Sequence, residues 1–328
     1  FPEPGTRIQR ISNLAEELAL SLNAPACRVF RRGGLVQVEV PRVDPRPVKF
    51  LSLCSRLEQV PECSALLGLD EEAVPVFLRL PSADVAHVLI SVNTGSGKTV
   101  LARTMALSLA MYNAPRSLQL VLIDPKRRGL SVLAPLPHLL APLIHRTEEA
   151  AELLGRLVQE MERRDLRGRS SPRIVVFIDE LADLMMVGGQ SIEQPLTRLA
   201  QRGRESGIHL VVCTQRPAAS VIGGLIKSNF PVRIVGSVAS AEDAKVAAGL
   251  PQTGAERLLG RGDFLVIARG ETIRVQGAYA TLSEMRRIVG QLQAGRGLSS
   301  VATGVGQRVV EATSRWIHRL PAWTGTGD

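Results

Sequence analysis

The stretch that decides the fold is HVLISVNTGSGKT, residues 87–99. Its apolar first half predicts a buried strand, and Gly95 and Gly97 then let the chain turn into a helix. In this layout the backbone N–H groups of the loop cradle phosphate oxygens, Lys98 reaches the β- and γ-phosphates, and the Thr99 hydroxyl holds Mg²⁺. The stretch therefore predicts a phosphate-binding loop. Its expected nucleotide contacts are Asn93, Thr94, Gly95, Ser96, Gly97, Lys98, Thr99 and Val100.

One position departs from the full pattern of such loops. Glycine normally stands six residues before the lysine, and this chain has Val92 there. A β-branched side chain restricts the backbone to negative φ, so the first turn of the loop must differ. Because Gly95 and Gly97 lie nearer the phosphates, we expect the loop to form. Val92 leaves open a nucleotide-binding scaffold with weakened hydrolysis.

The composition is that of a globular protein with a basic surface. The 328 residues are 45% hydrophobic and 22% charged, with a net charge of +9 and a pI near 10.1. These values favour an acidic partner such as nucleic acid, although an arginine-rich surface without such a partner fits them too. Aromatic residues make up only 3%, which argues against stacking on single strands and favours contact with backbone phosphates.

Cysteine spacing and apolar runs bear on the cellular compartment. The four cysteines show no C-x-x-C spacing, which argues against a metal site built on them and predicts a reduced, cytoplasmic setting. No apolar run approaches the ~18 residues of a membrane span, so no membrane segment is expected in this chain. Because the chain begins with Phe1, membrane association through a partner or through an upstream segment stays open.

Three regions follow one another along the chain. Residues 1–72 predict a small α+β domain, residues 73–280 an α/β domain, and residues 281–328 a helix followed by a flexible tail. The middle region alternates apolar strand runs with helical segments, which is typical of a mostly parallel sheet flanked by helices. Its strand candidates are Val88–Val92, Leu118–Ile123, Ile174–Ile178, Ile208–Cys213, Val232–Val235 and Phe264–Ile267.

Polar residues follow two of these strands at the point where each ends. Asp179 and Glu180 come directly after one strand, and Gln215 follows another. At the edge where the loop lies, Asp179 could hold Mg²⁺, Glu180 could polarise the attacking water, and Gln215 could sense the γ-phosphate. An acidic helix start and a polar turn before proline are the alternatives, and the adjacent glycine loop makes them less favoured.

Taken together, these motifs resemble the motor core of the FtsK/SpoIIIE DNA translocases. The similarity keeps a consistent order over about residues 7 to 280, and RISNL (10–14) is similar to the small α-domain that precedes the motor in that family. Besides residues 87–99, the stretches that carry it are IDPK (123–126), PHLL (137–140), EMERR (160–164), VFIDELADLMM (176–186), GIHLVVCTQRP (207–217), GLIK (224–227) and GAERLLGRGD (254–263).

The resemblance implies a RecA-like P-loop ATPase that forms a hexameric ring and drives double-stranded DNA through it, as in chromosome partitioning or DNA transfer. ATP with Mg²⁺ would then lie between neighbouring subunits, and one subunit would supply an arginine finger to the next. Arg204 falls on the family position for that finger, with Arg198 and Arg202 as alternatives. The DNA contacts implied by the resemblance are Arg216, Lys227 and Lys245.

The resemblance is incomplete at the C-terminal end. The residues after Ala280 do not resemble the winged-helix module with which the family reads orientation sequences, so sequence-directed transport is not predicted from this chain. An ATPase of the same superfamily that moves protein substrates in secretion is the alternative from another class. The basic net charge favours DNA over protein as the substrate.

Overall fold

A computed structural model describes residues 10–11, 13–25, 27–32, 35–40, 46–57, 59–215 and 229–295. The chain divides into two compact units, Phe1–Pro47 and Val48–Asp328. The first unit holds the helix α2 (Ala15–Ser21) and the antiparallel pair β1 (Arg28–Arg32) and β2 (Leu35–Glu39). A helix with a strand pair is the small α+β arrangement that this end of the sequence predicts.

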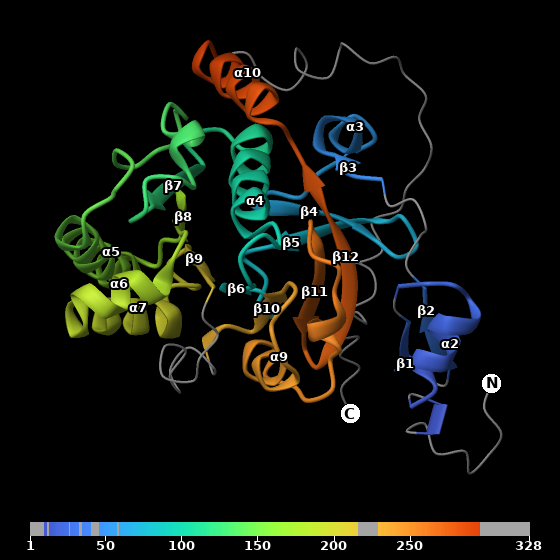
Figure 1. The fold of residues 1–328 in the computed structure, drawn as a ribbon. Coiled ribbons are helices and arrows are strands. Elements are labelled where there is room, and N and C mark those ends of the chain that lie inside the picture. Colours follow the sequence, from blue (N-terminus) through green and yellow to red (C-terminus); the bar gives the residue numbers. More distant parts are fainter. Residues whose placement is uncertain are drawn as a thin grey trace, which may run out of the picture. The chain divides into compact units, whose positions relative to one another are not determined.

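The second unit is built on a ten-stranded sheet (Figure 1). Five neighbouring strands run parallel, in the order β10-β6-β9-β8-β7. Their bounds are β6 (Val88–Ser91), β7 (Leu118–Ile123), β8 (Arg173–Ile178), β9 (Ile208–Thr214) and β10 (Val232–Val235). Each of the five corresponds to a strand expected from an apolar run, which confirms the predicted mostly parallel sheet.

The rest of the sheet continues antiparallel from β10, in the order β11-β12-β4-β5, and short β3 pairs parallel with β12. The bounds are β3 (Val48–Lys49), β4 (Ser64–Asp70), β5 (Pro75–Arg79), β11 (Asp263–Ala268) and β12 (Glu271–Tyr279). Of these, only β11 was expected as a strand. Although β4 lies within the predicted N-terminal domain of residues 1–72, it pairs inside this sheet; the domain boundaries at 72 and 280 stay predictions.

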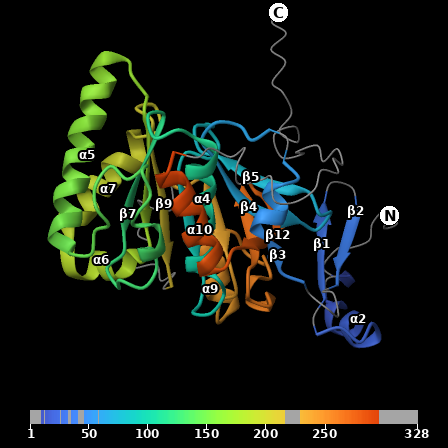
Figure 2. The ribbon, with the colours of Figure 1, turned by 90° about the horizontal axis from the view of Figure 1, so that it is seen from above.

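Helices cover both faces of the sheet, as Figures 1 and 2 show. Side chains alternate along β6, so that Val88 and Ile90 pack with α4 (Lys98–Tyr112) while Leu89 packs with the helices of the opposite face. Burial on both faces explains why the parallel strands are continuously apolar. The opposite face carries α5 (Thr147–Arg167), α6 (Leu181–Gly188) and α7 (Gln190–Arg202).

Smaller elements complete the second unit: α3 (Phe50–Cys54), α9 (Ala241–Ala248), α10 (Leu282–Gln293) and the 3₁₀ turns η1 (Ser131–Leu133) and η2 (Ala255–Arg257). Thr281 caps α10 in a capping box with Glu284, and α10 buries Ile288 in the core beside α4. The predicted flexible tail falls on residues 296–328, outside the described residues. Within the described part of the chain, every helix is too short or too polar to cross a membrane.

Candidate active site

The glycine loop joins the carboxyl end of β6 to the first turn of α4. Gly95 and Gly97 adopt φ of +86° and +102°, which L side chains rarely tolerate. Gly97 is also tightly packed, because a Cβ there would lie 3.1 Å from the backbone nitrogen of Gly262. The loop therefore has the strand–turn–helix context that a phosphate-binding loop requires.

Val92 packs against Gly236, and the absence of a side chain at Gly236 leaves room for valine. Its side chain is fully buried, and its N–H donates to the carbonyl of Thr214 at 3.2 Å. A Cβ at Gly236, just after β10, would lie 2.6 Å from Val92 Cγ1. Val92 is not among the residues with positive φ. The branched side chain thus fills space left by Gly236, and the backbone conformation at residue 92 suits valine.

Two further segments hold the loop in place. Asn93 donates its N–H to the carbonyl of Ser237 at 2.8 Å, and the Ser96 hydroxyl donates to the same carbonyl at 3.3 Å. On the other side, the N–H of Gly262 donates to the carbonyl of Ser96 at 2.9 Å. The loop is therefore fixed by the segments that follow β10 and precede β11, as well as by its own glycines.

Lys98 and Glu180 form a buried ion pair at the centre of the site. The Lys98 ammonium lies 3.0 Å from Glu180 Oε2 and 3.8 Å from Asp179 Oδ1, and it also donates to the carbonyl of Asp179. All three residues are at most 5% exposed. Burial alone would lower the pKa of Lys98, but the neighbouring Cys213 and the two carboxylates outweigh it and raise this pKa above its ordinary value. The lysine is therefore a stable cation.

Thr99 and Asp179 present hard oxygen ligands beside that ion pair. The Thr99 hydroxyl donates to Asp179 Oδ1 at 3.3 Å, so a hydroxyl and a carboxylate converge on one point. Hydroxyl and carboxylate oxygens are the donors that Mg²⁺ accepts, and the residues fit that ion. Gly129 allows the close approach, because a Cβ there would lie 2.6 Å from Asp179 Oδ2. Burial raises the pKa of Asp179 against the opposing effect of Lys98.

Gln215 joins the carboxylate pair to the glycine loop. Its N–H donates to Glu180 Oε1 at 3.1 Å, and its side-chain Oε1 accepts from the Thr94 hydroxyl at 2.9 Å. The structure therefore brings together, at the carboxyl ends of β6, β8 and β9, the residues predicted from three separate motifs. Convergence at this edge is where open α/β sheets bind ligands.

Arg204 lies at the opposite edge of the same sheet. It stands just before β9, whereas Gln215 follows the last residue of β9. At about 3.3 Å per residue, a seven-residue strand separates the two edges by roughly 20 Å. Its alternatives are held within the chain, because Arg198 pairs with Glu162 and Arg202 lies 2.7 Å from Asp165. Among the described residues, the guanidinium of Arg204 forms its ion pair with the adjacent Glu205, at 3.4 Å.

Comparison with known proteins identifies the family. Residues 58–167 and 165–219 match the model of the FtsK/SpoIIIE family, and the chain is 37% identical over 324 residues to the DNA translocase FtsK of Sporosarcina ureae. The chain belongs to the FtsK/SpoIIIE family. That match covers 88% of this chain and 41% of the relative, so the chain spans about two fifths of the length of this relative.

Solved structures with the same P-loop ATPase fold agree with the FtsK/SpoIIIE assignment. The pCW3 conjugation coupling protein TcpA, determined with ATPγS, superposes with a TM-score of 0.66 at 24% identity, over 89% of this chain and 87% of TcpA. The cytoplasmic domain of the Thermomonospora curvata type VII secretion ATPase EccC gives a TM-score of 0.63 at 25% identity, over 76% of this chain and 34% of EccC. The nucleotide-binding fold is therefore confirmed.

The predicted DNA contacts fall in different parts of this FtsK/SpoIIIE chain. Arg216 and Lys227 lie outside the described residues. Lys245 is exposed on α9, the helix that packs beside β10. The structure therefore places Lys245 on the surface.

Sequence reasoning missed the residues that support the loop from outside. These residues are Gly236, Ser237 and Gly262, which lie far from the loop in the sequence. Of the three, only Gly262 falls in a stretch that the sequence analysis singled out, the glycine-rich run before β11. Lys126 was expected only as part of the IDPK stretch that carries the resemblance. The Lys126 ammonium lies 2.9 Å from Asp183 Oδ2 and 4.0 Å from Glu180 Oε2, which adds a second cation beside the buried glutamate.

Proposed function

We propose that this chain is the ATP-hydrolysing motor of a ring that moves double-stranded DNA. The support is the cluster of Lys98, Thr99, Asp179, Glu180 and Gln215 at one edge of the sheet, in a basic chain related to proteins named DNA translocases. The net charge of +9 suits contact with DNA phosphates. ATP is the substrate class that a P-loop with a paired carboxylate takes.

In this proposal Glu180 is the general base and Lys98 binds the β- and γ-phosphates. Lys98 is held by Glu180 at 3.0 Å, so its transfer to phosphate oxygens releases the carboxylate to polarise the attacking water. Gln215, which touches both Glu180 and Thr94, reports occupancy of the loop to the base. Mg²⁺ held by Thr99 and Asp179 would neutralise charge on the phosphates.

Arg204 completes the site of a neighbouring copy in this proposal. It lies roughly 20 Å from the nucleotide edge of its own subunit, so it reaches a γ-phosphate only across an interface. An arginine there stabilises charge that develops in the transition state. This geometry supports a closed ring, and six is the subunit number that we propose from the family.

Phosphate contacts without base reading suit a motor that must move along any sequence. We assign these contacts to Arg216, Lys227 and Lys245, of which Lys245 is exposed. Binding through a few such cations predicts a steep loss of DNA affinity as salt is raised. A flat salt dependence contradicts this part of the proposal.

The decisive experiment measures ATP turnover with and without long duplex DNA, beside the variant Glu180→Gln. We expect duplex DNA to stimulate the unchanged protein. Glu180→Gln removes the base but keeps the shape of the side chain, so it should bind a fluorescent ATP analogue normally and lose turnover by roughly 100-fold or more. Turnover that ignores DNA, or that survives Glu180→Gln, contradicts the proposal.

Secretion of protein substrates is the second candidate, favoured by the structural similarity to the secretion ATPase EccC. It predicts turnover that responds to a peptide signal and ignores duplex DNA, so the same assay separates the two candidates. A scaffold without hydrolysis is disfavoured because Gly236 accommodates Val92 and leaves Gly95 and Gly97 in the loop conformation.

A further inference from the structure

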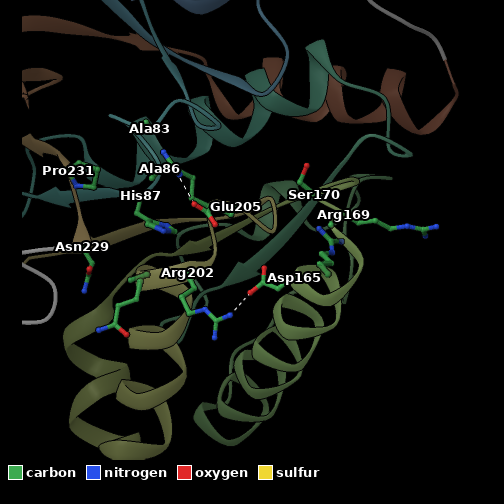
Figure 3. A pocket seen from close by; sticks show the side chains of 15 residues that line it. Ala83, Ala86, His87, Asp165, Arg169, Ser170, Arg202, Glu205, Asn229 and Pro231 are labelled. Atoms are coloured by element: carbon green, nitrogen blue, oxygen red, sulfur yellow. Dashed lines mark hydrogen bonds and ion pairs between the residues drawn. The ribbon is translucent and has the colours of Figure 1, made fainter.

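A polar cavity of about 780 Å³ lies at the amino-terminal edge of the parallel strands, opposite the glycine loop. It opens between the residues before β6 and β10, the end of α5, and the link from α7 to β9 (Figure 3). Its charged lining consists of Arg164, Arg169, Arg202, Arg204, Asp165 and Glu205. Three of these arginines have carboxylate partners, so the excess positive charge of the cavity is that of Arg169, and the cavity suits an anion.

The segment that carries Arg204 is fixed firmly against this cavity. Arg164 is 5% exposed and donates to the carbonyls of Pro172 at 2.7 Å and Ser206 at 3.0 Å. Gly207 has φ of +74°, and a Cβ there would lie 2.0 Å from the carbonyl of Ser170. Arg164 therefore holds the backbone beside Arg204 in place, and the backbone that carries Arg204 is well fixed.

His87 lines the same cavity from the start of β6. It is 2% exposed, and its Nδ1 accepts the N–H of Leu210 in β9 at 3.1 Å. An accepting Nδ1 places the proton of the neutral ring on Nε2. Burial, followed by the neighbouring His209 and Arg204, lowers the pKa of His87 to about 3, so the ring stays neutral at physiological pH.

His87 presents its ring to the cavity. Among the described residues, the one hydrogen bond of the His87 ring is that of Nδ1. Figure 3 shows the ring facing the space that Arg202 and Glu205 also border. The adjacent His209 differs, because its Nδ1 bonds to the carbonyl of Ala86 at 3.0 Å and it does not line the cavity. An N–H that borders a cavity lined by arginines suits a ligand that accepts hydrogen bonds and carries negative charge.

We propose that His87 donates its Nε2–H, beside Arg204, to the terminal phosphate of a nucleoside triphosphate bound in the loop of a second copy of this chain. This inference rests on the proposed function, in which Arg204 acts across an interface. His87 is then a catalytic residue of the neighbouring site. Its Nδ1 bond to β9 keeps it in register with Arg204, since both precede neighbouring strands.

Two substitutions of His87 test the roles of its ring nitrogens Nδ1 and Nε2 separately. In His87→Asn, the side-chain oxygen can replace Nδ1 and accept from Leu210, but nothing replaces Nε2. In His87→Gln, the longer amide places its NH₂ near the position of Nε2 and loses the acceptor at Nδ1. We expect His87→Asn to fold, to bind a fluorescent ATP analogue with unchanged affinity, and to lose about 10- to 100-fold in kcat. His87→Gln should melt at a lower temperature and yet retain at least about tenfold more turnover than His87→Asn.

A structural role for His87 predicts a different pattern. Turnover would then follow thermal stability, with His87→Gln the slower of the two variants, and that result overturns the inference, as does an unchanged kcat in His87→Asn. His209→Asn is the matched control, because it removes a buried histidine that does not line the cavity. It should lower the melting temperature and leave kcat unchanged.

Mixed assemblies test whether His87 acts across the interface. Lys98→Ala subunits lack a working loop but keep His87 and Arg204, so mixing them with His87→Asn subunits should give more turnover than the two proteins give separately. The mixture of Lys98→Ala with Arg204→Ala tests the proposed function itself. If that control gains nothing, the cross-subunit site is wrong. If the control gains turnover and the His87→Asn mixture does not, only the role of His87 is overturned.

Discussion

The two edges of the parallel sheet differ in how their charged groups are engaged. At the carboxyl edge, Lys98, Glu180 and Gln215 bond to one another and form a cluster that is complete within one chain. At the amino edge, Arg164 and Arg202 bond to their own chain, and within the described part of the chain the ion pair of Arg204 is with its sequence neighbour. In the proposed function, one edge binds and activates the nucleotide, whereas the other supplies groups to the site of a neighbouring copy.

In the proposed function, this difference assigns two half-sites to a single subunit. β9 joins them, because Arg204 precedes it and Gln215 follows it. A rigid strand within a packed sheet transmits displacement between its ends with little deformation. In the proposed function, β9 thus links nucleotide sensed at Gln215 in one site to the arginine offered to the next site.

The largest expected effect is that of Arg204→Ala. Removing a finger that acts in trans should lower kcat by about 10³-fold and leave binding of a fluorescent ATP analogue unchanged. Arg198→Ala and Arg202→Ala are matched controls on the same segment, each tied to an α5 carboxylate. Steady-state turnover and equilibrium titration of the three variants provide the measurement.

The comparison between the edges fails if Arg204→Ala weakens nucleotide binding as much as turnover, since that result places the arginine in its own subunit's site. A larger loss in Arg198→Ala or Arg202→Ala would instead move the finger to that residue. Either outcome leaves the carboxyl edge as described and reassigns only the amino edge.

An intermediate effect is expected where Val92 meets Gly236 at the carboxyl edge. Gly236→Ala places a Cβ about 2.6 Å from Val92 Cγ1, so it should lower the free energy of unfolding by ~1–3 kcal/mol. Val92→Gly removes the obstructing side chain, and the double variant should recover much of the Gly236→Ala loss. Urea unfolding of the four proteins gives the coupling energy.

Turnover of the same four proteins tests whether the pair also sets the loop. We expect Gly236→Ala alone to lower turnover, because Ser237 beside it holds Asn93 and Ser96. Additive changes in unfolding free energy, with no coupling, would show that Val92 and Gly236 do not share one space.

The sequence predicted the carboxyl edge well because its residues lie in contiguous motifs. Lys98 and Thr99 stand in one run, and Glu180 and Gln215 each follow a strand that the apolar runs revealed. The residues that support the loop were not predicted. Gly236 and Gly262 lie beside the loop because of the order of the strands in the sheet, and local sequence patterns do not reveal that order. The strands β4, β5 and β12 were missed for a related reason. They are antiparallel neighbours whose burial changes along their length, without the long apolar run of a strand covered on both faces.

The smallest expected effect is a pH dependence of stability that comes from the amino edge. Burial lowers the pKa of His87 to about 3 and that of His209 to about 4, whereas an unfolded histidine titrates near pH ~6.5. Between about pH 6.5 and 4 the unfolded chain therefore binds more protons than the folded chain. The free energy of unfolding should fall as pH decreases through this window, by ~1.4 kcal/mol per pH unit for each histidine.

His209→Asn isolates one of the two histidines. Carboxylates also titrate in acid, but they are the same in both proteins, so the difference in unfolding free energy between the variant and the unchanged protein reports His209 and its effect on the pKa of His87. That difference should be constant above about pH 6.5 and should shrink as pH falls to 4.5, because the variant has lost one proton-linked cost of folding. Urea unfolding at half-unit steps of pH measures it. A difference that stays constant across the whole range shows that His209 titrates alike in the folded and unfolded chain. Burial would then not keep His209 neutral.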